Sequence, residues 1–67
     1  MARFFFDLQG TQDAVDPTGL PFETELHAFR AAQRLAAELS SNRPNLRGST
    51  YVVVTRKDIA DAYYVSV

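Results

Sequence analysis

The fold of this chain is decided by the stretch Arg3-Phe4-Phe5-Phe6-Asp7-Leu8, which is short, apolar at consecutive positions and followed by Gln9-Gly10. A β-strand sends alternate side chains to opposite faces of its sheet. Three successive phenylalanines therefore place large apolar groups on both faces, and we expect this strand to be central. The chain has one amphipathic helix, which can cover one face of the sheet. The other apolar face is left without a cover from this chain, so we predict that a partner molecule covers it.

That helix is predicted to begin after Thr24 and to end before Pro44. Thr24 is a favourable N-cap, and Glu25 suits the positive end of the helix dipole. Proline disfavours a helical conformation at the preceding residue, so we expect the helix to end within residues 40–42. A projection at about 100° per residue gathers the apolar side chains on one arc. This arc comprises Ala28, Phe29, Ala32, Leu35, Ala36 and Leu39.

Three further strands are predicted from short apolar or β-branched segments. A second strand is expected at Ala14–Asp16, followed by the type I turn Asp16-Pro17-Thr18-Gly19, in which the Asp16 side chain bonds the backbone. Ser49–Thr55 and Ala62–Val67 are the third and fourth strands, joined by the charged turn Arg56–Asp61. The order β-β-α-β-β predicts an α+β fold, with one helix packed on one face of a four-stranded antiparallel sheet.

The alternation of side chains also assigns the two faces of the sheet. We place Phe4, Phe6, Leu8, Val52, Val54, Tyr63, Val65 and Val67 under the helix, and Phe5, Asp7, Tyr51, Val53, Thr55, Tyr64 and Ser66 on the open face. Exposed apolar patches of a few hundred Å² mark interaction sites. The predicted interface on the open face consists of Phe5, Tyr51, Val53 and Tyr64.

Composition limits the classes of function. The 67 residues form one domain, 1–67. A domain of this size is marginally stable alone, and because the chain has no cysteine for disulfides, we expect self-association to add stability. The net charge of −1 disfavours binding to nucleic acid or to an anionic membrane. No apolar run approaches the roughly 20 residues of a membrane helix, and no signal-peptide core is present. We therefore expect a cytoplasmic protein.

The residues that carry chemistry in enzymes show no catalytic pattern. His27 lies on the polar face of the predicted helix, without an orienting partner. Asp7, Asp13 and Asp16 lack the spacing of a calcium loop. The serines lack a nucleophile elbow, and the isolated glycines form no phosphate-binding loop. We expect no enzyme activity, no cofactor and no metal.

One alternative function rests on the basic residues of the loops. Arg43, Arg47, Arg56 and Lys57 are the candidate anion contacts, and aromatic rings of the sheet face add a surface for stacking bases. The alternative is therefore a weak binder of single-stranded nucleic acid. Against it stands the near-neutral charge of the chain, because such platforms are normally basic.

The order of these motifs resembles a family of small uncharacterised proteins, DUF6894, common in alphaproteobacteria. The resemblance rests on the opening Arg3-Phe4-Phe5-Phe6, on the Asp16-Pro17-Thr18-Gly19 turn and on the Ala- and Arg-rich helix from Ala28 to Leu39. It implies a final hairpin, where the chain has residues 56–61 in place of the family's second Asp-x-x-Gly turn. The resemblance implies a fold and a bacterial source, and no activity.

These observations together predict a small, non-enzymatic interaction module. We expect it to self-associate, as a homodimer, through the open sheet face or a sheet edge, although another protein is an alternative partner. Nucleic acid and membranes are disfavoured as partners.

Overall fold

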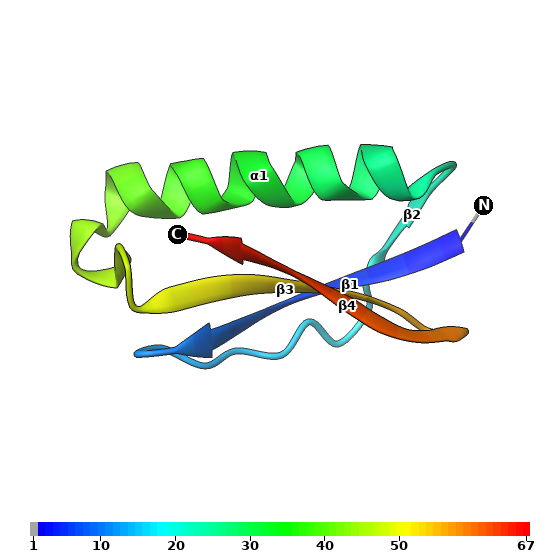
Figure 1. Cartoon of the computed structure of the whole chain (residues 1–67), viewed down its shortest axis with the longest axis horizontal. Helices are drawn as coiled ribbons and strands as arrows, with labels where there is room; N and C mark the ends of the chain where they lie inside the picture. The colour runs from blue at the N-terminus through cyan, green and yellow to red at the C-terminus, as the bar shows by residue number, and fades with distance from the viewer. Residues whose placement is uncertain (1) are drawn as a thin grey trace.

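The computed structural model describes residues 2–67, except for the side chains of residues 59 and 60, and it arranges them in two layers (Figure 1). The helix α1 lies along one face of a four-stranded antiparallel sheet, whose strand order is β2-β1-β3-β4. This confirms the predicted α+β fold and the interior position of the first strand. The elements are β1 (Ala2–Gly10), β2 (Leu20–Phe22), α1 (Glu25–Asn42), the 3-10 turn η1 (Pro44–Leu46), β3 (Thr50–Arg56) and β4 (Ile59–Ser66).

The helix begins and ends where the sequence predicts. The Thr24 hydroxyl accepts the backbone N–H of His27 at 3.2 Å, which satisfies one of the free donors at the start of the helix. The last helical residue is Asn42, two positions before Pro44. Three alanines on its inner face are buried against the sheet, and small side chains there let the helix axis approach the strands closely. They are Ala28, Ala32 and Ala36.

The core lies between α1 and one face of the sheet. Its buried residues are the three alanines with Phe4, Val52 and Val54, and Phe6, Leu8, Val65 and Val67 pack against them. These positions confirm the predicted helix-side face. Tyr63 also points to the helix side, because its ring packs edge-on against Phe29 at a centroid distance of 6.3 Å.

The prediction for the second strand is wrong. Within residues 14–16, Ala14 makes an isolated bridge to Leu8, and the strand that joins the sheet is Leu20–Phe22. The physical reason is that the side chain of Asp16 bonds the neighbouring backbone, so the chain turns at Asp16 instead of extending. β2 pairs with the start of β1, with Leu20 opposite Phe4.

The last hairpin is tighter than predicted. Lys57 and Asp58 form the turn, so β3 extends to Arg56 and β4 begins at residue 59. A register shift between Thr55 and Arg56 marks a bulge at this end of the pair, and bulges bend the strand that carries them. The part of β4 that pairs regularly with β3 is therefore its second half, from Ala62 to Ser66, which we call the flat part of β4.

Candidate interaction surface

The carboxylate of Asp16 joins the connection between β1 and β2 to the edge of β1. It accepts backbone N–H groups from Phe6 at 3.2 Å, Thr18 at 3.3 Å and Gly19 at 3.0 Å. The predicted role of Asp16 in its own turn is thus confirmed, and the bond to Phe6 is an addition. The guanidinium of Arg3 donates to the carbonyls of Thr18 at 2.9 Å and Gly19 at 3.3 Å, which fixes the turn from its other side.

Gly19 is required by this turn for two reasons. Its φ of +71° lies in the left-handed region, which other residues rarely adopt. A Cβ atom at this position would lie 2.7 Å from the carbonyl oxygen of Phe4 and 3.0 Å from the ring of Phe5. The turn therefore packs directly against β1, and it partly covers Phe5 on the open face.

The hydrogen bonds to Asp16 also change its acidity. The Gly19 N–H is the largest cause of a lowered pKa for Asp16, partial burial acts in the opposite direction, and the other two N–H donors and Arg3 lower the pKa further. A carboxyl group whose pKa is lower in the folded state stabilises the fold above its unfolded pKa, here near 3.8. This contribution is lost as the pH falls through the folded-state pKa.

Replacing Asp16 with asparagine is expected to lower the free energy of unfolding by about 1–3 kcal/mol at pH 7, because an amide group cannot accept all three N–H bonds. Urea unfolding followed by circular dichroism between pH 7 and pH 2.5 measures the effect. The difference in the free energy of unfolding between wild type and Asp16→Asn should become smaller below about pH 4, as the Asp16 carboxylate of the wild type becomes protonated. Asp13→Asn is the control, because Asp13 accepts one exposed N–H, from Gly10. Equal losses in both variants, or a gap that is independent of pH, would contradict the proposed role.

The outer edge of β1 is closed along its whole length. Residue pairs in an antiparallel ladder alternate between bonded and non-bonded, so every second residue of a strand faces away from a given neighbour. The N–H of Thr11 donates to the carbonyl of Ser49 and continues the ladder to β3, which makes the even-numbered residues of β1 face outward. Each of them meets a partner: Ala2 and Phe4 pair with β2, Phe6 bonds Asp16, Leu8 bonds Ala14 and Gly10 bonds Asp13.

β2 lies at one edge of the sheet and is protected by its sequence. By the same alternation, Leu20 and Phe22 face β1, and Pro21 faces outward. Proline has no backbone N–H, so this edge offers no donor to a further strand. A short edge strand that contains proline is a recognised protection against unwanted pairing.

β4 lies at the opposite edge, and the features that protect an edge, a bulge and the charged Asp61, are confined to its first part. The N–H of Val67 donates to the carbonyl of Thr50 at 3.0 Å, so the odd-numbered residues of β4 face β3. The outward backbone groups of the flat part belong to Ala62, Tyr64 and Ser66, and within the described chain β4 pairs with β3 alone. Residues 62–66 contain no proline and no charged residue.

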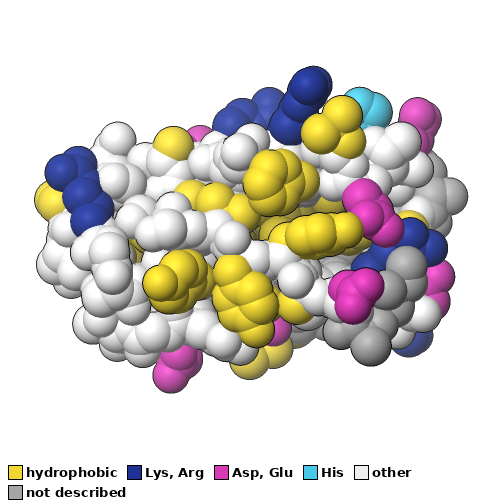
Figure 2. Space-filling view, viewed as in Figure 1, with side chains coloured by type: hydrophobic (Ala, Val, Ile, Leu, Met, Phe, Trp, Pro, Cys, Tyr) yellow, Lys and Arg dark blue, Asp and Glu magenta, His cyan; other side chains and the backbone are white. Residues whose placement is uncertain are grey.

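Exposed apolar side chains flank the β4 edge on both sides of the sheet. Figure 2 shows hydrophobic side chains gathered over β4 and the adjoining flank of α1. On the open face, the rings of Tyr51 and Tyr64 stack edge-on at 6.4 Å and are 42% and 61% exposed as residues. On the helix side, Tyr63 is 42% exposed and lines a shallow groove of about 290 Å³ with Leu26 and Phe29.

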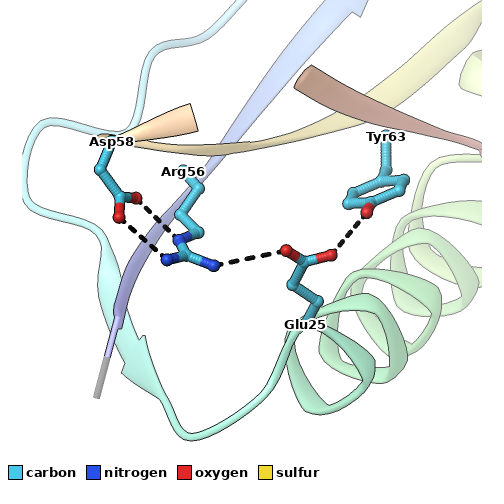
Figure 3. A network of polar contacts seen from close by, with 4 residues as sticks. All are labelled: Glu25, Arg56, Asp58 and Tyr63. Carbon is cyan, nitrogen blue, oxygen red and sulfur yellow. Dashed lines mark hydrogen bonds and ion pairs between the residues drawn. The ribbon is translucent and has the colours of Figure 1, made fainter. Parts of the chain in front are cut away.

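A polar network holds Tyr63 against the helix (Figure 3). One oxygen of Glu25 accepts the Tyr63 hydroxyl at 2.6 Å, and the other lies 3.3 Å from the Arg56 guanidinium. Arg56 also makes two bonds to Asp58, at 2.7 and 2.9 Å. The Glu25 carboxylate raises the pKa of Tyr63, since the bond favours the neutral phenol. The network fixes the side chain next to the β4 edge.

The four predicted interface residues differ in exposure. Tyr51 and Tyr64 are exposed, Phe5 is half-buried and Val53 is 3% exposed. The sequence predicts association through the open face or a sheet edge, and the exposed rings of that face lie toward the β4 edge. The sequence does not indicate which edge is free, and Tyr63 is absent from the predicted interface. The proline at position 21 was a signal, because it marks the other edge as closed.

The candidate anion contacts do not meet in one place. Arg43 and Arg47 flank η1 at the C-terminal end of α1, whereas Arg56 ends β3 and Lys57 lies in the turn that follows. Figure 1 shows these two segments at opposite ends of the molecule, which is 34 Å long. Arg43 bonds Gln12 at 3.3 Å, and Arg47 bonds the Ser40 carbonyl at 2.9 Å. Arg56 is held by its two carboxylates, so the structure forms no basic platform beside Tyr51 and Tyr64 from these four residues.

The carboxylates of the first connection are occupied by backbone donors. Asp7 accepts the N–H of Asp16 at 2.9 Å, and Asp13 and Asp16 accept the bonds given above. Among the residues that the structure describes, no three metal-binding side chains are grouped. His27 is exposed on α1. In the same part of the chain, no helix has the length and hydropathy that crossing a bilayer requires.

A comparison with models of protein families gives a match. The model of a domain of unknown function, DUF6894, matches residues 3–61, which is most of the chain. Neither the curated proteins nor the solved structures gave a match.

Proposed function

The chain belongs to the DUF6894 family, a domain of unknown function, and from its geometry we propose that it is a non-enzymatic interaction module that self-associates through the outer edge of β4. The observation that carries this proposal is the contrast between the edges of the sheet. β1 is closed by the 11–19 connection and β2 by Pro21, whereas Ala62, Tyr64 and Ser66 present unpaired backbone groups.

A second copy of β4 fits this edge better than an unrelated partner of high charge. The flat part of β4 is uncharged, and its flanking rings are apolar with polar tips, which suits a surface that meets its own copy. Tyrosine is enriched in protein interfaces for the same reason. Antiparallel pairing of two identical edges is isologous, so it closes as a dimer and does not propagate.

The expected affinity is modest. Aromatic side chains bury about 150–250 Å² each, so the exposed parts of Tyr51, Tyr63 and Tyr64 leave roughly 300 Å² to cover on each copy. Two copies then bury roughly 600 Å² of tyrosine surface, and the backbone edge adds to this area. The tyrosine surface alone is about half of the 1,200 Å² at which standard-size interfaces begin. We expect a reversible dimer with a dissociation constant of about 1–100 μM.

Light scattering after size-exclusion chromatography, over a dilution series from millimolar to low micromolar concentration, tests the proposal. The mass should rise from 7.5 kDa toward twice that value as the concentration increases. Amide hydrogen exchange of the wild-type chain locates the contact. The N–H groups of Ala62, Tyr64 and Ser66 should become protected with concentration, while those of Tyr63 and Val65 are protected throughout. A monomer at millimolar concentration would refute self-association.

A further inference from the structure

We infer that the two copies pair with the two-fold axis beside Tyr64, so that Tyr64 of one copy lies opposite Tyr64 of the other. The inference rests on the proposed function, because it specifies the arrangement at the same edge. The alternation of the β3–β4 ladder leaves the groups of Ala62, Tyr64 and Ser66 facing outward. An axis beside Tyr64 pairs all three, since Ala62 of each copy then lies opposite Ser66 of the other.

Other registers use fewer of these groups. With the axis beside Val65, Tyr64 would pair with Ser66, and Ala62 would lie opposite a position beyond Ser66, where β4 ends. With the axis beside Tyr63, Ser66 would lie opposite residue 60, which lies within the bulge, where the regular pairing of β4 with β3 is interrupted. The Tyr64 register is therefore the one in which the flat parts of both strands overlap completely.

Charge disfavours registers whose axis lies closer to Asp61 than Tyr64 does. Asp61 is exposed and directly precedes the flat part of β4. With the axis beside Ala62, the two Asp61 residues would lie two positions apart along the strands, about 7 Å at the rise of a β-strand. With the axis beside Tyr64, they lie six positions apart, about 20 Å, which exceeds the Debye length of roughly 8 Å at physiological salt. Repulsion between the two carboxylates is then screened.

The side chains that meet in this register are complementary. Residues opposite each other in an antiparallel pair lie on the same face. On the open face the Tyr51–Tyr64 pair of one copy continues into the same pair of the other, which makes a row of aromatic rings across the axis. On the helix side Tyr63 of one copy lies opposite Val65 of the other, so an exposed ring covers a half-buried aliphatic side chain. Two four-stranded sheets become one continuous sheet with both helices on one face.

Disulfide trapping tests the register, because the chain has no cysteine of its own. Ala62→Cys and Ser66→Cys are made as separate single variants, mixed in equal amounts at a concentration above the dissociation constant, and oxidised. Opposite residues lie about 5.5 Å apart between Cα atoms, within the range that a disulfide spans. Mass spectrometry should find the mixed dimer, which joins one chain of each variant, at least tenfold in excess over either homodimer.

Three results distinguish the two proposals. A wild-type chain that stays monomeric in light scattering refutes self-association and the register with it. A wild-type dimer whose Ala62→Cys or Ser66→Cys variant cross-links by itself refutes the register alone, because the axis would then lie beside residue 62 or 66. A wild-type dimer that gives none of these cross-links also refutes the register. Light scattering of the two variants under reducing conditions tests whether each still dimerises. If one of them does not, Tyr64→Cys replaces the pair, because in the proposed register it should cross-link to its own copy, and a dimer of this variant without that cross-link refutes the register.

Discussion

Replacing Phe4 with alanine is expected to destabilise the fold by about 3–5 kcal/mol, the usual cost of removing a fully buried phenylalanine. Phe4 is 1% exposed and is the largest of the fully buried side chains. Its ring packs edge-on against Phe22 at 6.1 Å and belongs to the cluster that also contains Val52 and Val54. No single neighbour can move into the space, because the cluster is held by the sheet on one side and by the alanines of α1 on the other.

A loss of this size is comparable to the whole stability of a domain below about 70–80 residues. We therefore expect most Phe4→Ala molecules to be unfolded at 25 °C, with the helical signal at 222 nm lost in circular dichroism. Urea unfolding measures the free energy of unfolding of the variant and the wild type. Repeating it at several protein concentrations separates the stability of the monomer from the contribution of dimerisation, which depends on concentration.

Phe5→Ala is the matched control for this prediction. Phe5 is the next residue, points to the opposite face and is half-buried against the Gly19 turn. Its removal should cost about 1–2 kcal/mol, in proportion to the smaller apolar area that it buries. If Phe5→Ala lowers the free energy of unfolding as much as Phe4→Ala does, the assignment of Phe4 to the core between β1 and α1 and of Phe5 to the opposite face is wrong.

The sequence predicted those features of the fold that depend on local chemistry. Thr24 and Pro44 mark the helix because capping and proline geometry act within a few residues. The alternation along Phe4, Phe6 and Val52, Val54 identified the core face, because one buried face imposes a period of two. These features require no knowledge of which strands are neighbours.

The features that the sequence missed depend on contacts between distant segments. Ala14-Val15-Asp16 has the pattern of a strand, but the bond from Phe6 to Asp16 becomes visible when β1 and the connection are seen together. Leu20-Pro21-Phe22 was not recognised as a strand because proline is depleted in strands, except at edges. Whether Tyr63 or Tyr64 presents its backbone outward depends on the register of β3 with β4, and no local pattern encodes that register.

That register leads to the prediction with the largest expected effect on association. Tyr64→Pro is expected to leave the monomer folded and to weaken the dimer more than tenfold. The N–H of Tyr64 faces the free edge, so proline removes no bond from the β3–β4 ladder. Proline removes the N–H at the centre of the dimer and places its ring against the opposing strand. Each 1.4 kcal/mol of binding free energy lost in this way raises the dissociation constant tenfold.

Tyr63→Pro and Tyr64→Ala are the two controls for this prediction. The N–H of Tyr63 faces Val54 across the ladder, so proline there should break the hairpin and unfold the chain. Tyr64→Ala removes the same ring as Tyr64→Pro but keeps the N–H, so the difference between their dissociation constants isolates the backbone contact. Light scattering across a dilution series gives the constants, and circular dichroism gives the fold. A Tyr64→Pro chain that unfolds would show that this N–H faces inward. One that dimerises as tightly as Tyr64→Ala would show that the copies associate without the β4 backbone.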